Sequence, residues 1–163
     1  MFDIVNGTGA GAACLMTPAR DGHAGSGPCQ QCRAIAMSNM DRFTSEMLYP
    51  ALEGLRSSET GLNGTVIPPP WIAEKDRRQH WPIKTSDMTP GEERPPFVFC
   101  HGDLSYHNIL VDPDTLEVKW LLDWECAGFF PDKFLRVFSP TRADYVRLFT
   151  NDERRKHFVN LLE

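Results

Sequence analysis

The sequence predicts an α+β domain in which helices predominate and one small β-hairpin carries the polar residues of a site. Three observations lead to this class. Apolar residues recur at helical spacing over residues 33–57, short apolar runs lie within residues 97–125, and shorter helical patterns follow residue 131. Turn residues separate the apolar runs, so we expect strands in the middle of the chain and helices on both sides of them.

The length and composition indicate one globular domain. The chain has 163 residues, of which 41% are hydrophobic and 24% charged, as in ordinary globular proteins. Its formal charge of −5 argues against a nucleic-acid partner. No apolar run approaches the roughly 20 residues that cross a bilayer, so no membrane partner is expected. Five cysteines without a regular framework, and the lack of a secretory leader, favour a cytoplasmic protein with reduced thiols.

Residues 1–32 form a Gly/Ala-rich segment with few large apolar side chains. Such a segment buries too little surface to offset its ordering entropy, so we expect disorder there and a folded domain over residues 33–163. Two binding motifs remain open in this segment. Asn6–Gly11 is a glycine pattern without flanking strands. Four residues could hold Zn²⁺, although their gaps match no regular zinc finger: Cys14, His23, Cys29 and Cys32.

The first predicted element is an amphipathic helix over residues 33–57. Pro50 lies within it, and proline removes a helical hydrogen bond, so we expect a kink or a division there. Glycines and three successive prolines over residues 61–70 predict turns and extended chain. Residues 71–96 are polar and rich in proline, which predicts a long loop.

The strands are predicted within residues 97–125. Phe97–Cys100 is the first apolar run, and two more follow near residues 109–111 and 117–122. The turn sequence Asp112–Thr115 separates the last two runs, so they should form a hairpin. After Pro131 we expect short helices, the last of them over residues 152–162 with Asn151 or Asp152 as its cap.

Polar residues mark the ends of these strands. Asp103 and Asn108 bracket the loop that leads into the hairpin, and Asp123 ends its returning strand. A hairpin places the start of its first strand beside the end of its second, so Asn108 and Asp123 should face one another. An amide oxygen and a carboxylate suit Mg²⁺, which completes its coordination with water and phosphate. Asp103 would lie nearby, where it could orient an attacking hydroxyl or accept its proton.

The same segment carries a resemblance to a known family. HGDLSYHN at residues 101–108, LDWE at 122–125 and CAGFFP at 126–131 resemble the aminoglycoside phosphotransferase/choline kinase-like family, and the likeness extends over roughly residues 40–160. The resemblance implies the mainly helical C-terminal lobe of a protein-kinase-like fold with a small catalytic β-hairpin. It also implies ATP- and Mg²⁺-dependent phosphoryl transfer to the hydroxyl of a small molecule.

The resemblance also implies a specific role for each of five residues in these motifs. Asp103 is the catalytic base and His101 braces the catalytic loop. Asn108 and Asp123 hold Mg²⁺ against the phosphates of ATP, and Glu125 adds a direct or an indirect contact to the metal. The pattern begins HGD in place of the HRD of protein kinases, which favours a small-molecule acceptor over a protein.

The nucleotide-binding lobe of that family has no evident counterpart in this sequence. Such a lobe supplies a glycine-rich loop over the phosphates and a lysine on a strand. The first lysine here is Lys75, inside the polar loop. We therefore expect a phosphotransferase domain without its N-terminal lobe, with activity reduced or lost through truncation. The alternative is a catalytically silent kinase-like lobe that acts as a binding module or has no independent function.

Overall fold

The computed structural model describes residues 30–72, 81–86, 95–112 and 115–162. The predicted disorder of residues 1–32 therefore falls almost entirely outside the described residues. So do the glycine pattern Asn6–Gly11 and three of the four candidate zinc ligands. The fourth, Cys32, is described: it is buried in the first helix beside Ala36 and Leu116.

The structure mixes helices with small antiparallel sheets, which confirms the α+β class. The helical elements, in chain order, are α1 (Gln30–Arg42), the π segment η1 (Phe43–Leu48), α2 (Tyr49–Glu53), the 3₁₀ turns η2 (Tyr106–Asn108) and η3 (Asp132–Phe134), α3 (Arg142–Thr150) and α4 (Asp152–Asn160). The strands are β1 (Arg56–Ser57), β2 (Phe97–Cys100), β3 (Ile109–Val111), β4 (Val118–Leu121) and β5 (Gly128–Pro131). Within the described part of the chain, no helix is long and apolar enough to cross a membrane.

The predicted first helix is present but is shifted and divided. It runs without a gap from Gln30 to Glu53, so it begins three residues before the boundary expected at residue 33. Pro50 lies in the first turn of α2, where its missing N–H is tolerated. The turn before it widens into the π segment, in which the Tyr49 N–H donates to the Thr44 carbonyl. The division expected at Pro50 therefore takes the form of a π segment within a continuous helix.

The hairpin predicted from the turn at residues 112–115 is confirmed. Strands β3 and β4 pair antiparallel, with Ile109 opposite Leu121 and Leu110 opposite Trp120. A register shift follows Leu110, which bends the hairpin locally. The Asn39 amide donates to the Leu116 carbonyl at 2.9 Å, which ties α1 to the turn of the hairpin.

The first apolar run does not join the hairpin. Strand β2 lies instead in the middle of a second sheet of order β1-β2-β5, antiparallel throughout. Strand β5, formed by Gly128–Pro131, was not predicted, because its partner lies about thirty residues earlier and no turn signal joins the two. The catalytic-loop candidates therefore lie between two sheets, following β2 and preceding β3.

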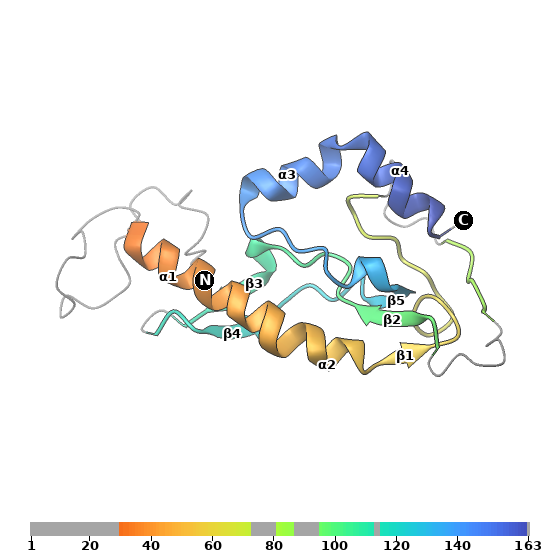
Figure 1. Ribbon diagram of the computed structural model, residues 1–163, viewed down its shortest axis with the longest axis horizontal. Coiled ribbons are helices and arrows are strands. Elements are labelled where there is room, and N and C mark those ends of the chain that lie inside the picture. The colour runs from red at the N-terminus through yellow and green to blue at the C-terminus, as the bar shows by residue number, and fades with distance from the viewer. Residues whose placement is uncertain (1–29, 73–80, 87–94, 113–114, 163) are drawn as a thin grey trace.

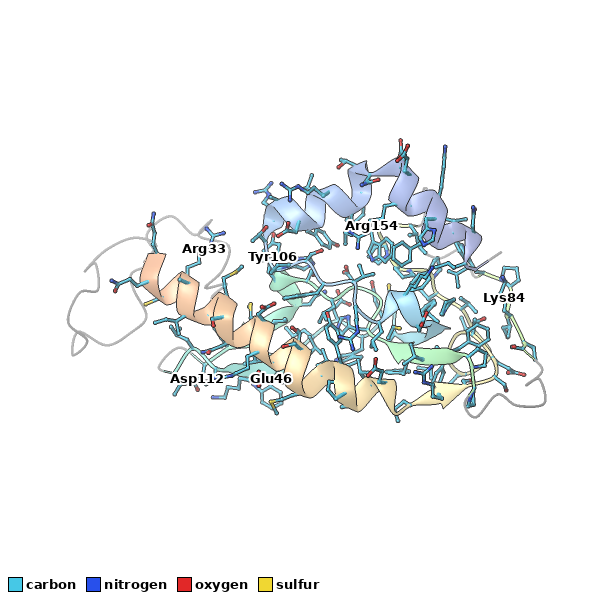
Figure 2. All side chains as sticks on the ribbon, in the orientation of Figure 1. Arg33, Glu46, Lys84, Tyr106, Asp112 and Arg154 are labelled. Atoms are coloured by element: carbon cyan, nitrogen blue, oxygen red, sulfur yellow. The ribbon has the colours of Figure 1, made fainter. Side chains whose placement is uncertain are left out.

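The long helix α1–α2 and the pair α3–α4 lie on opposite sides of β2 and β5 (Figure 1). Figure 2 labels Arg33 and Glu46 on the long helix and Arg154 on α4, with the side chains of the core between them. Trp71 is central to that core: its ring lies 5.0 Å from that of Phe158 on α4 and 6.0 Å from that of Phe134. Aromatic packing thus attaches the last helix to the centre of the domain.

Helices α3 and α4 have the caps that their sequences indicate. The Thr141 side chain accepts from the Asp144 N–H at the start of α3. The Asn151 side chain accepts from the Arg154 N–H, so Asn151 is the cap of the last helix, one of the two predicted residues. One apolar residue on each helix, Leu148 and Phe158, is buried against the core.

Candidate active site

The segment from His101 to Asn108 connects the two sheets and is fixed by backbone hydrogen bonds. The Tyr106 N–H donates to the Ser139 carbonyl at 2.9 Å, and the Ser139 N–H donates to the Leu104 carbonyl at 3.1 Å. Ser105 is fully buried at this bridge. The loop is therefore held against the segment that leads into α3. This segment follows the hairpin in the sequence.

Gly102 gives this loop its sharp turn. Its φ is +83°, in the left-handed region, and a Cβ placed there would overlap the carbonyl oxygen of Cys126. The Gly102 carbonyl accepts from the Trp71 indole N–H at 3.1 Å. Position 102 therefore requires glycine, and the buried Trp71 fixes the orientation of the Gly102 carbonyl.

His101 links the loop to the hairpin. Its Nε2 lies 2.8 Å from the Leu122 carbonyl, and its Nδ1 accepts from the Asp103 N–H at 3.3 Å. These two contacts require a neutral ring with the proton on Nε2. Burial lowers the pKa of His101, and its hydrogen bond to the Leu122 carbonyl opposes that effect in part. This is the geometry that a bracing residue needs.

The neutral state of His101 predicts a dependence of stability on pH. The pKa of His101 is lowered from its ordinary 6.5 in the folded protein, so below that pH the unfolded chain binds more protons. The free energy of unfolding should fall as the pH drops below 6.5, by up to about 1.4 kcal/mol per pH unit for this one group.

Urea unfolding of the wild type and of His101→Gln at pH 7 and pH 5 measures this effect. The difference in stability between the two proteins should depend on pH. The exposed His157 provides a matched control, since His157→Gln should preserve the wild-type pH dependence. If His101→Gln shows the same pH dependence as the wild type, His101 is not held neutral.

Asp103 has an unequal environment at its two carboxylate oxygens. Oδ2 lies 3.4 Å from the Tyr145 hydroxyl, 3.4 Å from the Asn108 amide nitrogen and 4.0 Å from His107 Nε2. Oδ1 is buried and has no hydrogen-bond partner among the described residues. Burial raises the pKa of Asp103, while His107 and the hydroxyl of Tyr145 act in the opposite direction. A buried carboxylate with one oxygen left without a donor has capacity for an incoming hydroxyl.

Asn108 lies opposite Leu122 in the hairpin, so Asp123, which was expected to face it, follows one residue later. The Leu122 N–H donates to the Asn108 carbonyl at 2.8 Å, which extends the hairpin ladder by one pair beyond Ile109 and Leu121. The Asn108 amide nitrogen donates to the Asp103 carbonyl at 2.9 Å, so the amide oxygen is the atom left for a ligand. Asp123 follows Leu122 with φ of +63° and an exposed side chain. Its negative charge acts on the pKa of both His101 and Asp103, which places it at the same site.

Residues 40–131 of the chain match the family model named APH, described as the phosphotransferase enzyme family. The match covers more than half of the chain and includes the loop, the hairpin and β5. The chain belongs to the phosphotransferase enzyme family. A search of curated proteins and a search of solved structures each gave no significant match.

Within this member of the family, the predicted site residues are placed unequally. Asp103 is hydrogen-bonded to both His101 and Asn108, and Asp123 is joined to them through the backbone of its neighbour Leu122. Glu125 is exposed and forms no hydrogen bond or ion pair with the other four in the described structure. In the same described part, no group of three or more His, Cys, Asp or Glu side chains is placed to hold a metal ion.

The donor set of the site nevertheless fits one kind of metal. The amide oxygen of Asn108 and the exposed carboxylate of Asp123 are hard oxygen ligands at adjoining positions of the hairpin. Mg²⁺ is usually held by one or two carboxylates and completes its coordination with water and substrate phosphates. A protein site of only two ligands is therefore compatible with a metal that arrives with a nucleotide.

Three residues around this site were not predicted from the sequence. Tyr145 reaches Asp103 from α3, Trp71 holds Gly102, and Trp124 packs its ring 4.5 Å from that of His101. Tyr145 is 42 residues away from Asp103, and it lies beyond the matched residues of the family model. No spacing rule connects residues so far apart, so the sequence alone could not indicate these contacts.

Proposed function

We propose that this phosphotransferase transfers the γ-phosphoryl group of ATP, bound with Mg²⁺, to the hydroxyl of a small molecule. The observation that carries the proposal is the unequal environment of Asp103. One of its oxygens faces three potential donors while the other has no partner among the described residues, beside the two oxygen ligands Asn108 and Asp123. The family assignment supports phosphoryl transfer, and the site chemistry supports the metal and the acceptor class.

In this proposal the hairpin holds the metal–nucleotide complex. Asn108 contributes its amide oxygen and Asp123 its carboxylate, and Glu125 is close enough in sequence to contribute through a water molecule. Bound Mg²⁺ supplies positive charge against the β- and γ-phosphate oxygens. The two hydrogen bonds of Leu122 and the left-handed backbone of Asp123 fix the main chain that carries this carboxylate before any ligand binds.

Asp103 acts on the acceptor. Its free oxygen accepts a hydrogen bond from the acceptor hydroxyl and takes the proton as the new P–O bond forms, and the bond between the γ-phosphorus and ADP breaks. The raised pKa of Asp103 improves it as a base relative to an exposed aspartate. Because Oδ1 is enclosed in this structure, the contact requires a local rearrangement around Asp103 when the acceptor binds.

We further propose that the described fold is the C-terminal lobe of a kinase-like enzyme, with the acceptor bound on the side of α3 and α4. The resemblance to aminoglycoside phosphotransferases and choline kinases makes a cationic alcohol the acceptor class to test first. The rest of the nucleotide contacts would come from parts of the fold outside this site. We expect weak activity from a protein that lacks these nucleotide contacts.

Calorimetric titration of the folded protein with ATP in the presence and absence of Mg²⁺ tests the proposal. We expect saturable binding that requires Mg²⁺. Asp123→Asn should weaken it at least about 10-fold, since it removes the charged metal ligand. Asp152→Asn, which changes an exposed carboxylate on α4, should bind like the wild type.

The result with Glu125→Gln determines the role of Glu125. A loss of affinity comparable to that of Asp123→Asn would make Glu125 a metal ligand, while wild-type affinity would exclude it from the site. Absence of Mg²⁺-dependent binding at millimolar ATP, in protein shown to be folded, would contradict the proposed function. It would favour the alternative of a catalytically silent lobe.

A further inference from the structure

We propose that Tyr145 is a positioning residue for Asp103, which selects the carboxylate oxygen that meets the acceptor. The inference rests on the proposed function of Asp103 and adds a residue to its site. Tyr145 belongs to α3, outside the residues that match the family model. Its hydroxyl donates to Asp103 Oδ2 at 3.4 Å.

The contacts of Asp103 all favour one orientation of its carboxyl group. Tyr145, Asn108 and His107 approach Oδ2, and none of them approaches Oδ1. The last torsion of an aspartate side chain is broad and nearly two-fold, so sterics alone do not fix which oxygen points where. The Tyr145 hydroxyl is the donor among these three that comes from outside the loop. It therefore fixes the carboxyl group relative to the helical side of the molecule.

The position of Tyr145 is itself well determined. Its ring meets those of His107 and Phe149 edge-on, with centroid distances of 4.6 and 5.1 Å. The first turn of α3 is capped by Thr141, whose hydroxyl donates to the Asp144 carboxylate at 2.6 Å. Ring packing thus holds the phenol independently of its hydroxyl group.

The backbone of the catalytic loop is joined to the same region. The bridge between Ser105 and Ser139 lies a few residues before α3, and the Ser105 hydroxyl lies 3.1 Å from His107 Nδ1. Consequently the loop that carries Asp103 is fixed to the chain that leads into the helix of Tyr145 by the two backbone hydrogen bonds of Ser139, with Tyr106 and with Leu104. Such a support can keep a catalytic group within the narrow range of positions that transfer requires.

Tyr145→Phe isolates the hydroxyl, because phenylalanine keeps the ring contacts with His107 and Phe149. The rate of ADP release from Mg²⁺–ATP is measured with choline or an aminoglycoside as acceptor. We expect kcat to fall about 10- to 100-fold, with KM for ATP and for the acceptor unchanged, because the free carboxylate oxygen is no longer oriented. The free energy of unfolding should change little.

Tyr49→Phe is the matched control: it removes a phenol hydroxyl from a buried ring on α2, beside Arg136, and should leave kcat unchanged. Wild-type kcat in Tyr145→Phe would overturn the inference. So would a raised KM for the acceptor at unchanged kcat, which would make Tyr145 a binding residue.

A second readout separates this inference from the proposed function. The ¹³C signal of the Asp103 carboxyl carbon should shift in Tyr145→Phe and stay in place in Tyr49→Phe, whether or not the protein transfers phosphate. If the wild type releases no ADP but the signal shifts, the contact stands and the proposed function fails. If the signal does not move, the hydrogen bond is absent and the inference fails.

Discussion

Asp103→Asn should reduce phosphoryl transfer by about 10²- to 10⁴-fold, the usual contribution of a general base, while Mg²⁺–ATP binding persists. Asparagine has nearly the same shape and can present its amide oxygen to the donors that surround Oδ2. It cannot take the proton of the acceptor hydroxyl. The measurement is kcat for ADP release in the presence of an acceptor, with ATP affinity determined separately by calorimetry.

The same substitution should raise the free energy of unfolding at pH 7. Burial raises the pKa of Asp103 above its ordinary 3.8, so above that pH the folded chain binds more protons than the unfolded chain. The stability that the protonated Asp103 side chain contributes is therefore fully present below pH 3.8. It is lost as the pH rises through the pKa of Asp103 in the folded protein. Asparagine cannot ionise and avoids that loss. Lower activity together with higher stability is the combination expected of a residue kept for function.

Asp41→Asn provides the matched control for Asp103→Asn. Asp41 is exposed on α1, so the activity and the stability of the Asp41→Asn variant should stay close to those of the wild type. Transfer at the wild-type rate in Asp103→Asn would refute the role of Asp103 as base. Loss of transfer accompanied by a loss of stability would indicate that the substitution disturbs the fold of the loop.

Gly102→Ala should have the largest effect on stability of the changes considered. Alanine in the left-handed region costs about 1–2 kcal/mol. Its Cβ would also overlap the Cys126 carbonyl oxygen, and relieving an overlap with the backbone costs about 1–3 kcal/mol more. Movement of Gly102 would displace both neighbours, His101 and Asp103, so activity should fall as well. Urea denaturation measures the first effect and ADP release the second.

Gly64 separates the two causes. It has φ of +76°, close to that of Gly102, but a Cβ there meets nothing within 4 Å. Gly64→Ala should therefore show the backbone cost alone. If the two variants lose the same stability, the packing of Gly102 against Cys126 contributes nothing. If Gly102→Ala is clearly the less stable, the closeness of these two segments is part of what shapes the site.

Local patterns were sufficient for the elements whose signals lie within a few residues of one another. The hairpin of β3 and β4 followed from a turn sequence between two apolar runs, and the cap at Asn151 followed from its place before a helical pattern. The hairpin pairing itself places Asn108 opposite Leu122, one residue before Asp123, so the predicted facing of Asn108 and Asp123 is offset by one residue. The family was recognisable from three short motifs within residues 101–131, and the family model confirms it.

Only the tertiary structure decided the contacts between distant segments. It placed β2 between β1 and β5 and apart from the hairpin, put Trp71 on Gly102, and brought Tyr145 to Asp103. It also showed the two oxygens of Asp103 to be unequal, with one enclosed and unpartnered among the described residues. A hairpin or a helix cap is encoded by residues that are close in sequence, and these contacts depend instead on how the whole core packs. Packing has no local signature, because many arrangements of the same apolar residues satisfy the same pattern.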